Sequence, residues 1–154
     1  MFIIVHTETC TAIAGKISDR LEDTRLVPVS EALSDPEILG DFDNLGLVFE
    51  KDGKETPEPM RSFIKTVLGS YDLSSLEYMF SACVCDGSPA HALKIVEKLC
   101  SKVGCAPSLS ITVSPNAGSE ELDAIADRIK SGSIQLAKGS LGTMWYMKAH
   151  GIKR

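Results

Sequence analysis

Short apolar runs rich in β-branched residues alternate along this chain with segments of helical periodicity, and this alternation restricts the fold more than any other feature. The runs cover 2–6, 26–29, 45–49, 78–84 and 109–113. Their apolar character is mostly continuous rather than alternating, which is typical of parallel strands covered on both faces. Because right-handed crossovers join parallel neighbours, we predict an α/β fold with three layers and a doubly wound, five-stranded parallel sheet.

Four segments between these runs have the apolar stripe of an amphipathic helix. Two of them start with a cap residue and a proline at the first helical position, Thr56-Pro57 and Ser88-Pro89. Glycines at 69, 104 and 132 have positions typical of helix ends, and the left-handed conformation is expected at 104. The predicted helices cover 13–21, 57–68, 89–103 and 119–131, with a short weak helix over 34–39.

The composition fits one globular domain. With 154 residues, 44% of them hydrophobic, the chain is long enough to bury a core of its own. No run reaches the roughly 18 apolar residues that a membrane span requires. The start, 1–5, is too short and lacks the basic flank of a signal peptide. Five cysteines without a secretory signal indicate reduced thiols, so we expect a cytoplasmic protein with no transmembrane segment.

Charge is distributed unevenly along the chain, whose net charge is −5. All 21 acidic residues lie at or before Asp127, and only basic charges follow. An acidic body disfavours nucleic acid as a partner, because phosphate backbones are bound by basic surfaces. We predict a domain over 1–132 and a basic C-terminal extension over 133–154. The aromatic cluster 144–147 of that extension is expected to pack on the body or on a second copy, forming a homodimer, rather than on an acidic partner or a membrane.

Three loops would meet at the carboxyl edge of such a sheet, where open α/β folds bind their ligands. The first joins a strand to a helix, so its hydroxyls and backbone amides are suited to surround a phosphate. Its residues are Thr7, Glu8, Thr9, Cys10, Thr11 and Ala12. The pattern resembles the phosphate loop of flavodoxins, Ser/Thr-x-Thr-Gly-Asn-Thr/Ser. Thr7 and Thr9 match its first two hydroxyl positions, whereas Cys10, Thr11 and Ala12 replace its Gly, Asn and last hydroxyl residue.

The other two loops follow the third and fourth strands. The loop over 50–55 is charged. In flavodoxins this loop stacks an aromatic side chain on the isoalloxazine ring, and no aromatic residue is present in it here. The loop over 82–89 resembles the one after strand four in flavodoxin-like domains found beside bacterial ferredoxin modules, Thr-Cys-Gly-Gly-Ser-Pro. Cys85, Gly87, Ser88 and Pro89 match that pattern, and Asp86 takes one Gly position. The ferredoxin cluster run Cys-x-x-Cys-x-x-Cys-x-x-x-Cys-Pro is absent from the sequence.

This resemblance, which spans about 1–132, implies the strand order 2-1-3-4-5 and an FMN-binding electron-transfer protein or small flavoprotein. The first loop would hold the phosphate. The implied contacts of the ring are Lys51, Asp52, Gly53, Cys83, Cys85, Asp86, Gly87 and Ser88. No catalytic residue is predicted, because a bound flavin supplies the redox chemistry. An acidic surface suits a basic or ferredoxin-type redox partner.

Two alternatives stay open. The replaced Gly and Asn and the missing aromatic weaken a flavin site, so the chain is alternatively a degenerate flavodoxin-fold domain without FMN that acts as a protein-interaction or regulatory module. A thiol or soft-metal site built from Cys10, Cys83 and Cys85 is less favoured, since Cys-x-Cys differs from the paired Cys-x-x-Cys of most zinc and thioredoxin-type sites. Buried free cysteine is common as a small hydrophobic residue, and no metal is expected.

Overall fold

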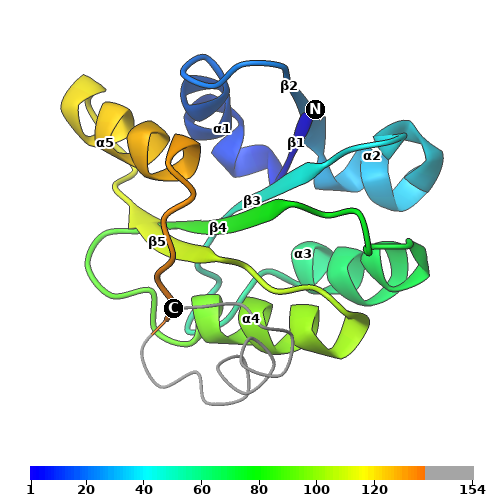
Figure 1. Ribbon diagram of the computed structural model, residues 1–154. Helices are drawn as coiled ribbons and strands as arrows, with labels where there is room; N and C mark the ends of the chain where they lie inside the picture. Colours follow the sequence, from blue (N-terminus) through cyan, green and yellow to red (C-terminus); the bar gives the residue numbers. More distant parts are fainter. Residues whose placement is uncertain (138–154) are drawn as a thin grey trace.

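Five parallel strands form the centre of the computed structural model, which describes residues 1–137. They are β1 (Phe2–His6), β2 (Thr24–Pro28), β3 (Asn44–Glu50), β4 (Tyr78–Val84) and β5 (Leu109–Val113). The order across the sheet is β2-β1-β3-β4-β5, and every neighbouring pair is parallel (Figure 1). The predicted fold class and strand order are confirmed.

Helices cover both faces of the sheet, because each crossover between parallel strands returns across one face. Helices α1 (Thr11–Ser18) and α5 (Ser119–Lys130) pack on one face. Helices α2 (Val29–Ser34), α3 (Glu58–Ser62) and α4 (Ala92–Val103) pack on the other (Figure 1). A π-helical turn, Phe63–Val67, and a 3₁₀ turn, Leu68–Ser70, continue α3.

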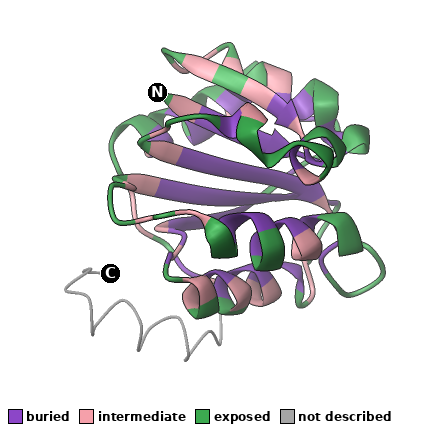
Figure 2. Ribbon diagram, turned by 90° about the vertical axis from the view of Figure 1, so that its right-hand side faces the viewer, coloured by how far each residue is buried: buried purple, intermediate pink, exposed green. Residues whose placement is uncertain are grey.

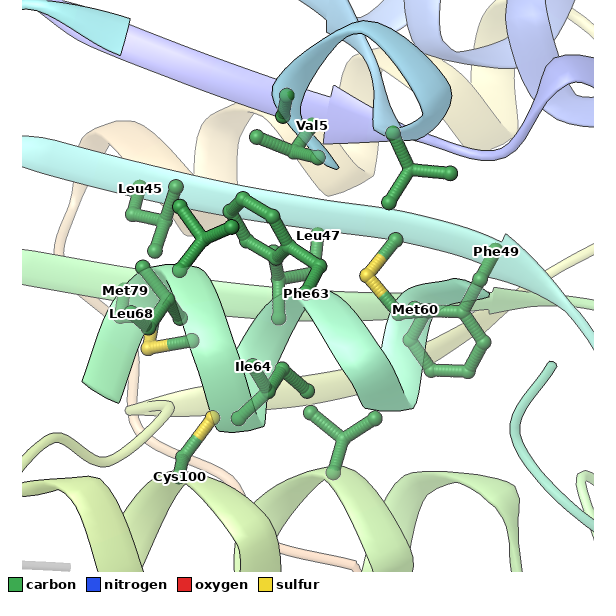
Figure 3. Packing of buried hydrophobic residues seen from close by; sticks show 14 of the residues in the cluster. Val5, Leu45, Leu47, Phe49, Met60, Phe63, Ile64, Leu68, Met79 and Cys100 are labelled. Carbon is green, nitrogen blue, oxygen red and sulfur yellow. The ribbon is translucent and has the colours of Figure 1, made fainter. Parts of the chain in front are cut away.

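Each face of the sheet has its own hydrophobic core, since successive strand residues point to opposite faces. The core under α2, α3 and α4 includes Phe49, Met60 and Phe63, all fully buried (Figure 3). The core under α1 and α5 includes Ile17 and Phe80. Strands β3 and β4 are buried along most of their length (Figure 2), which explains their continuously apolar sequences.

Gly46 marks a tight place in the core under α1 and α5. It pairs directly with Phe80 across β3 and β4, and a Cβ at Gly46 would overlap the Phe80 ring. On another side this ring contacts Phe2, with the ring centroids 5.6 Å apart. The buried ring of Phe80 therefore fills the space that the glycine leaves.

Two predicted helix caps are wrong because the hydroxyls have other partners. The buried Thr56 hydroxyl donates to the Ala92 carbonyl at 2.7 Å, and Pro57 precedes the first residue of α3. The Ser88 hydroxyl accepts a hydrogen bond from the Ala90 amide at 3.1 Å. Ala90 has a φ of 49°, which separates Ser88 from the start of α4 at Ala92.

The segment after β2 also differs from its prediction. Val29, predicted as the last residue of the strand, begins α2. The predicted short helix over 34–39 is divided between the end of α2 and a 3₁₀ turn, Pro36–Leu39. Asp35 lies between them with a φ of −142° and a ψ of 84°, because a residue before proline disfavours the helical region. The left-handed residue predicted at Gly104 is confirmed, with a φ of 94°.

A buried polar chain joins β4, β5 and α4. The Ser81 hydroxyl donates to Ser110 Oγ at 3.2 Å, and Ser110 donates to Glu97 Oε2 at 2.6 Å. The Ala137 amide donates to the same carboxyl oxygen at 2.8 Å. Glu97 is 0% exposed, and its Oε1 has no hydrogen-bond partner within residues 1–137. The buried carboxyl of Glu97 therefore links α4 to the sheet and to the segment after α5.

That segment, 133–137, belongs to the predicted extension and pairs with the edge of β5. The Gln135 amide donates to the Ser108 carbonyl at 2.8 Å, and the Gln135 carbonyl accepts from the Ser110 amide at 2.7 Å. Leu136 is buried. The rest of the extension, including the aromatic cluster 144–147, lies outside the described residues.

Tyr78 attaches the same segment, since its hydroxyl donates to the Ser133 carbonyl at 2.7 Å. Burial raises the pKa of Tyr78 from 10.0 to about 12. The folded protein therefore keeps this proton more tightly than the unfolded chain. The contribution of Tyr78 to stability is thus complete below pH 10 and is lost as the pH rises from 10 to 12. An ultraviolet absorbance titration should show one tyrosine with this high pKa, absent from Tyr78→Phe. A Tyr78 that ionises at its ordinary pKa would contradict the buried contact.

Candidate functional site

The first predicted loop is folded into the start of a helix. After β1, Thr7 leads into a 3₁₀ turn, Glu8–Cys10, and α1 continues directly from Thr11. Thr7 and Cys10 are buried, whereas Glu8, Thr9, Thr11 and Ala12 are exposed. The structure therefore brings the predicted phosphate loop to the carboxyl end of β1, with its two buried side chains facing inward.

Every polar group of Thr7 has a partner within the protein. Its amide donates to the Val48 carbonyl at 3.1 Å, and its carbonyl accepts from the Cys10 amide at 3.1 Å and lies 2.9 Å from His6 Nδ1. Its hydroxyl donates to Glu50 Oε2 at 2.9 Å. Thr7 is thus held in place by both β3 and its own turn.

Glu50 is the residue of this edge that sequence reasoning missed. It is the last residue of β3, one position beyond the predicted strand, and its Oε2 lies 2.9 Å from Thr7 Oγ1 and 3.7 Å from Cys10 Sγ. The alternation of strand side chains places Glu50 on the same face as Val48, toward α1. That alternation is the sequence signal that points Glu50 at the first loop.

Two further side chains of the first loop have partners as well. The Thr11 hydroxyl donates to the Glu8 carbonyl at 2.7 Å, and the Glu8 carboxylate accepts from Ser30 Oγ. Burial raises the pKa of the Cys10 thiol, and the nearby Glu50 carboxylate raises it further. Cys10 therefore remains a neutral thiol near pH 7, which is a hydrogen-bond donor and a poor nucleophile.

The loops after β3 and β4 are joined directly to each other. Lys51 Nζ donates to the Ser88 carbonyl at 2.9 Å, and the His91 amide donates to the Lys54 carbonyl at 3.0 Å. Both loops turn at a glycine with positive φ, 62° at Gly53 and 75° at Gly87. The exposed predicted site residues of these loops are Asp52, Gly53, Asp86, Gly87 and Ser88, and Lys51 is half-buried.

The sheet separates Cys10 from the other two thiols of the predicted loops. Cys83 and Cys85 are buried in the core under α2, α3 and α4, whereas Cys10 is buried under α1 and α5. Burial raises the pKa of Cys83, and the adjacent Cys85 thiol raises it further. Within residues 1–137 no group of three His, Cys, Asp or Glu side chains is arranged to hold a metal ion. The metal form of the three-thiol alternative is therefore wrong, whereas its redox form stays a prediction.

Solved structures with a similar fold include flavodoxin 2 from Bacillus cereus, with a TM-score of 0.62 and 19% identity over 84% of this chain and 97% of that protein. A Fusobacterium nucleatum flavodoxin bound to flavin mononucleotide has a TM-score of 0.60 and 14% identity over 84% of this chain and 96% of its own. The fold is flavodoxin-like.

A flavodiiron core, Flv1 from Synechocystis, shares the flavodoxin-like fold with a TM-score of 0.62 and 13% identity over 96% of this chain. The chain spans 36% of that longer protein. No protein-family model and no curated protein matches the sequence. No helix within residues 1–137 is long and apolar enough to cross a membrane.

The residues of this flavodoxin-like edge do not fit an FMN phosphate as they are arranged. The Thr7 hydroxyl is bound to Glu50, and the Thr11 hydroxyl is bound to the backbone of its own turn. A phosphate against Thr7 would also face the carboxylate of Glu50, and two like charges in one site are unfavourable. The loop after β3 has no aromatic face for the ring.

Proposed function

We propose that this chain is a flavodoxin-fold protein-interaction module whose carboxyl edge does not hold FMN. The observation that carries this proposal is the hydrogen bond from Thr7 to Glu50, which gives the best-placed hydroxyl of the phosphate loop to a side chain of the protein itself. The bonds from Lys51 to Ser88 and from His91 to Lys54 support it, because they join the other two loops into one continuous surface.

The partner that suits this surface is a protein with a basic face. The exposed acidic residues of the three loops are Glu8, Asp52, Glu55 and Asp86. The chain as a whole has a net charge of −5. Complementary charge raises the rate of encounter and favours the correct partner over others. A basic redox protein, or a ferredoxin-type protein that presents basic groups, has the required chemistry.

A second candidate is an FMN-dependent electron-transfer protein. The order of the strands, which brings all three loops to one edge, favours it, as does the likeness to a flavodoxin bound to flavin mononucleotide. Thr7, Thr9 and Thr11 would then hold the phosphate and 51–53 and 85–88 would border the ring. A bound FMN would supply one-electron redox chemistry. This candidate requires Glu50 to leave Thr7.

An absorption spectrum of fresh protein and a fluorescence titration with FMN separate the two candidates. We expect no flavin bands and no quenching of FMN fluorescence at micromolar protein, because Glu50 blocks the phosphate loop. A second experiment uses the protein as bait to capture binding partners. Their binding should depend on the exposed acidic residues of the three loops, so the Asp86→Lys variant should lose these partners.

The matched control for this capture is Asp127→Lys, which makes the same charge change at an exposed position near the carboxyl end of α5, outside the three loops. Bait with Asp127→Lys should retain the partners. A yellow preparation, or FMN bound at submicromolar concentration, would establish the second candidate instead. Equal loss of partners with both variants would reject the carboxyl edge as the interaction surface.

A further inference from the structure

We propose that Glu50 is an internal anion that occupies the anion position of the first loop, and that replacing it opens this loop to a phosphate monoester. The inference rests on the proposed function, because it names the side chain that keeps phosphate out. The Glu50 carboxylate accepts from the Thr7 hydroxyl at 2.9 Å and contacts the Cys10 thiol at 3.7 Å. It therefore uses both buried donors of the loop.

Glu50 and a phosphate oxygen would compete for one proton, that of the Thr7 hydroxyl. A threonine hydroxyl has a single hydrogen to donate, and in this structure Thr7 donates it to Glu50. The amide and carbonyl of Thr7 are bonded to Val48 and Cys10, so the residue has no other donor for an incoming group. A phosphate oxygen gains the Thr7 hydroxyl only when Glu50 releases it.

The charge of Glu50 also disfavours a phosphate at Thr7. A phosphate monoester carries about −1.5 to −2 at pH 7. Such a group at Thr7 would lie beside a carboxylate, and the two described side chains that donate hydrogen bonds to this carboxylate, Thr7 and Cys10, are both uncharged. The first turn of a helix otherwise favours an anion, because its first backbone N–H groups lack intrahelical partners, and the 3₁₀ turn Glu8–Cys10 and α1 begin at this loop. Glu50 satisfies that preference from within the chain.

Glu50 is also replaceable without loss of the fold. It is half-buried at the end of β3, and its register with Val84 is set by the backbone of the two strands. Neither hydrophobic core includes it. Variants at this position therefore change the donors of the first loop and leave the packing of the sheet in place.

The experiment compares the wild type with Glu50→Gln and Glu50→Ala, using FMN, riboflavin and inorganic phosphate as probes. The first variant keeps the shape and removes the charge, and the second also removes the acceptor. Glu31→Gln removes the same charge from an exposed position on α2 and is the matched control. Flavin fluorescence reports binding of FMN and riboflavin, and amide NMR shifts of 7–12 report inorganic phosphate. Circular dichroism confirms that each variant is folded.

Both Glu50 variants are expected to bind FMN at least about tenfold more tightly than the wild type, because a hydrogen bond to a charged group and the relief of a like charge are each of that order. Riboflavin, which lacks the phosphate, should gain nothing, and Glu31→Gln should match the wild type. If neither Glu50 variant gains affinity for FMN or inorganic phosphate, or if riboflavin gains as much as FMN, the inference is wrong and the proposed function stands. Tight FMN binding by the wild type would instead reject the proposed function.

Discussion

Gly46→Ala should lower the free energy of unfolding by about 1–3 kcal/mol. An alanine in a strand is on its own preferred to glycine by roughly 0.5–1 kcal/mol, so the expected loss comes entirely from packing. The added methyl group overlaps the fully buried Phe80 ring, which Phe2 contacts on another side. Urea denaturation of the two proteins measures the difference.

Gly15→Ala is the matched control, because the methyl group added there makes only an ordinary van der Waals contact. The nearest atom to a Cβ at Gly15 is Leu26 Cδ1 at 3.9 Å. Gly15 lies within α1, where alanine should raise the free energy of unfolding by about 0.5–1 kcal/mol. Phe80→Leu should also lower the free energy of unfolding by less in the Gly46→Ala background than in the wild type, because the shorter side chain relieves the overlap. If Gly46→Ala is as stabilising as Gly15→Ala, the packing argument for Gly46 is wrong.

Glu97→Leu should be less stable than Glu97→Gln by about 2–3 kcal/mol, because each buried donor left without an acceptor costs roughly 1–3 kcal/mol. Leucine removes the acceptor for both the Ser110 hydroxyl and the Ala137 amide. Glutamine removes the ionisable group and keeps one oxygen for these donors. Comparing the two neutral variants therefore isolates the hydrogen bonds from the removal of a buried carboxyl.

Hydrogen exchange locates the expected damage in Glu97→Leu. The amides of Gln135 and Ala137 should exchange at least about tenfold faster than in Glu97→Gln, because local opening now competes with a weaker attachment. Amides in the central strand β3, which lies away from Glu97, should be much less affected. Equal exchange at Gln135 and Ala137 in the two variants would show that Glu97 does not hold this segment.

The sequence predicts the fold well because several local signals agree. Continuous apolar strands, glycines at helix ends and amphipathic stripes all indicate a doubly wound sheet, and the structure confirms it. Helix starts are less predictable. Thr56 and Ser88 have the residue type and the following proline of an N-cap, but their hydroxyls bind Ala92 and Ala90 instead. The hydrogen-bond partner of a hydroxyl depends on which groups lie near it in the folded protein, and a single sequence does not specify those groups.

In the candidate site, too, the positions of the loops are predictable, but the hydrogen-bond partners of their residues are not. The positions of the three loops follow from the strand order and are predictable, whereas the hydrogen bond from Thr7 to Glu50 joins residues 43 positions apart. A carboxylate at the end of an apolar strand reads as an ordinary solvent-exposed residue. Glu97 is missed for the same reason, since a glutamate in an amphipathic helix is seldom fully buried without a charged partner.

The strand order has a consequence for how the chain folds as it is synthesised. β1 lies between β2 and β3 in the sheet. It can pair with β2 first, because β3 is synthesised about twenty residues later than β2. From β3 onward each new strand adds to one side only, β4 on β3 and β5 on β4, and Gln135 then covers part of β5. Unpaired strand edges recruit other chains, and nascent domains are exposed to this hazard while they are incomplete. On the ribosome, this side of the sheet presents a single open edge at each stage, and it is covered by the next strand of the chain or, for β5, by Gln135.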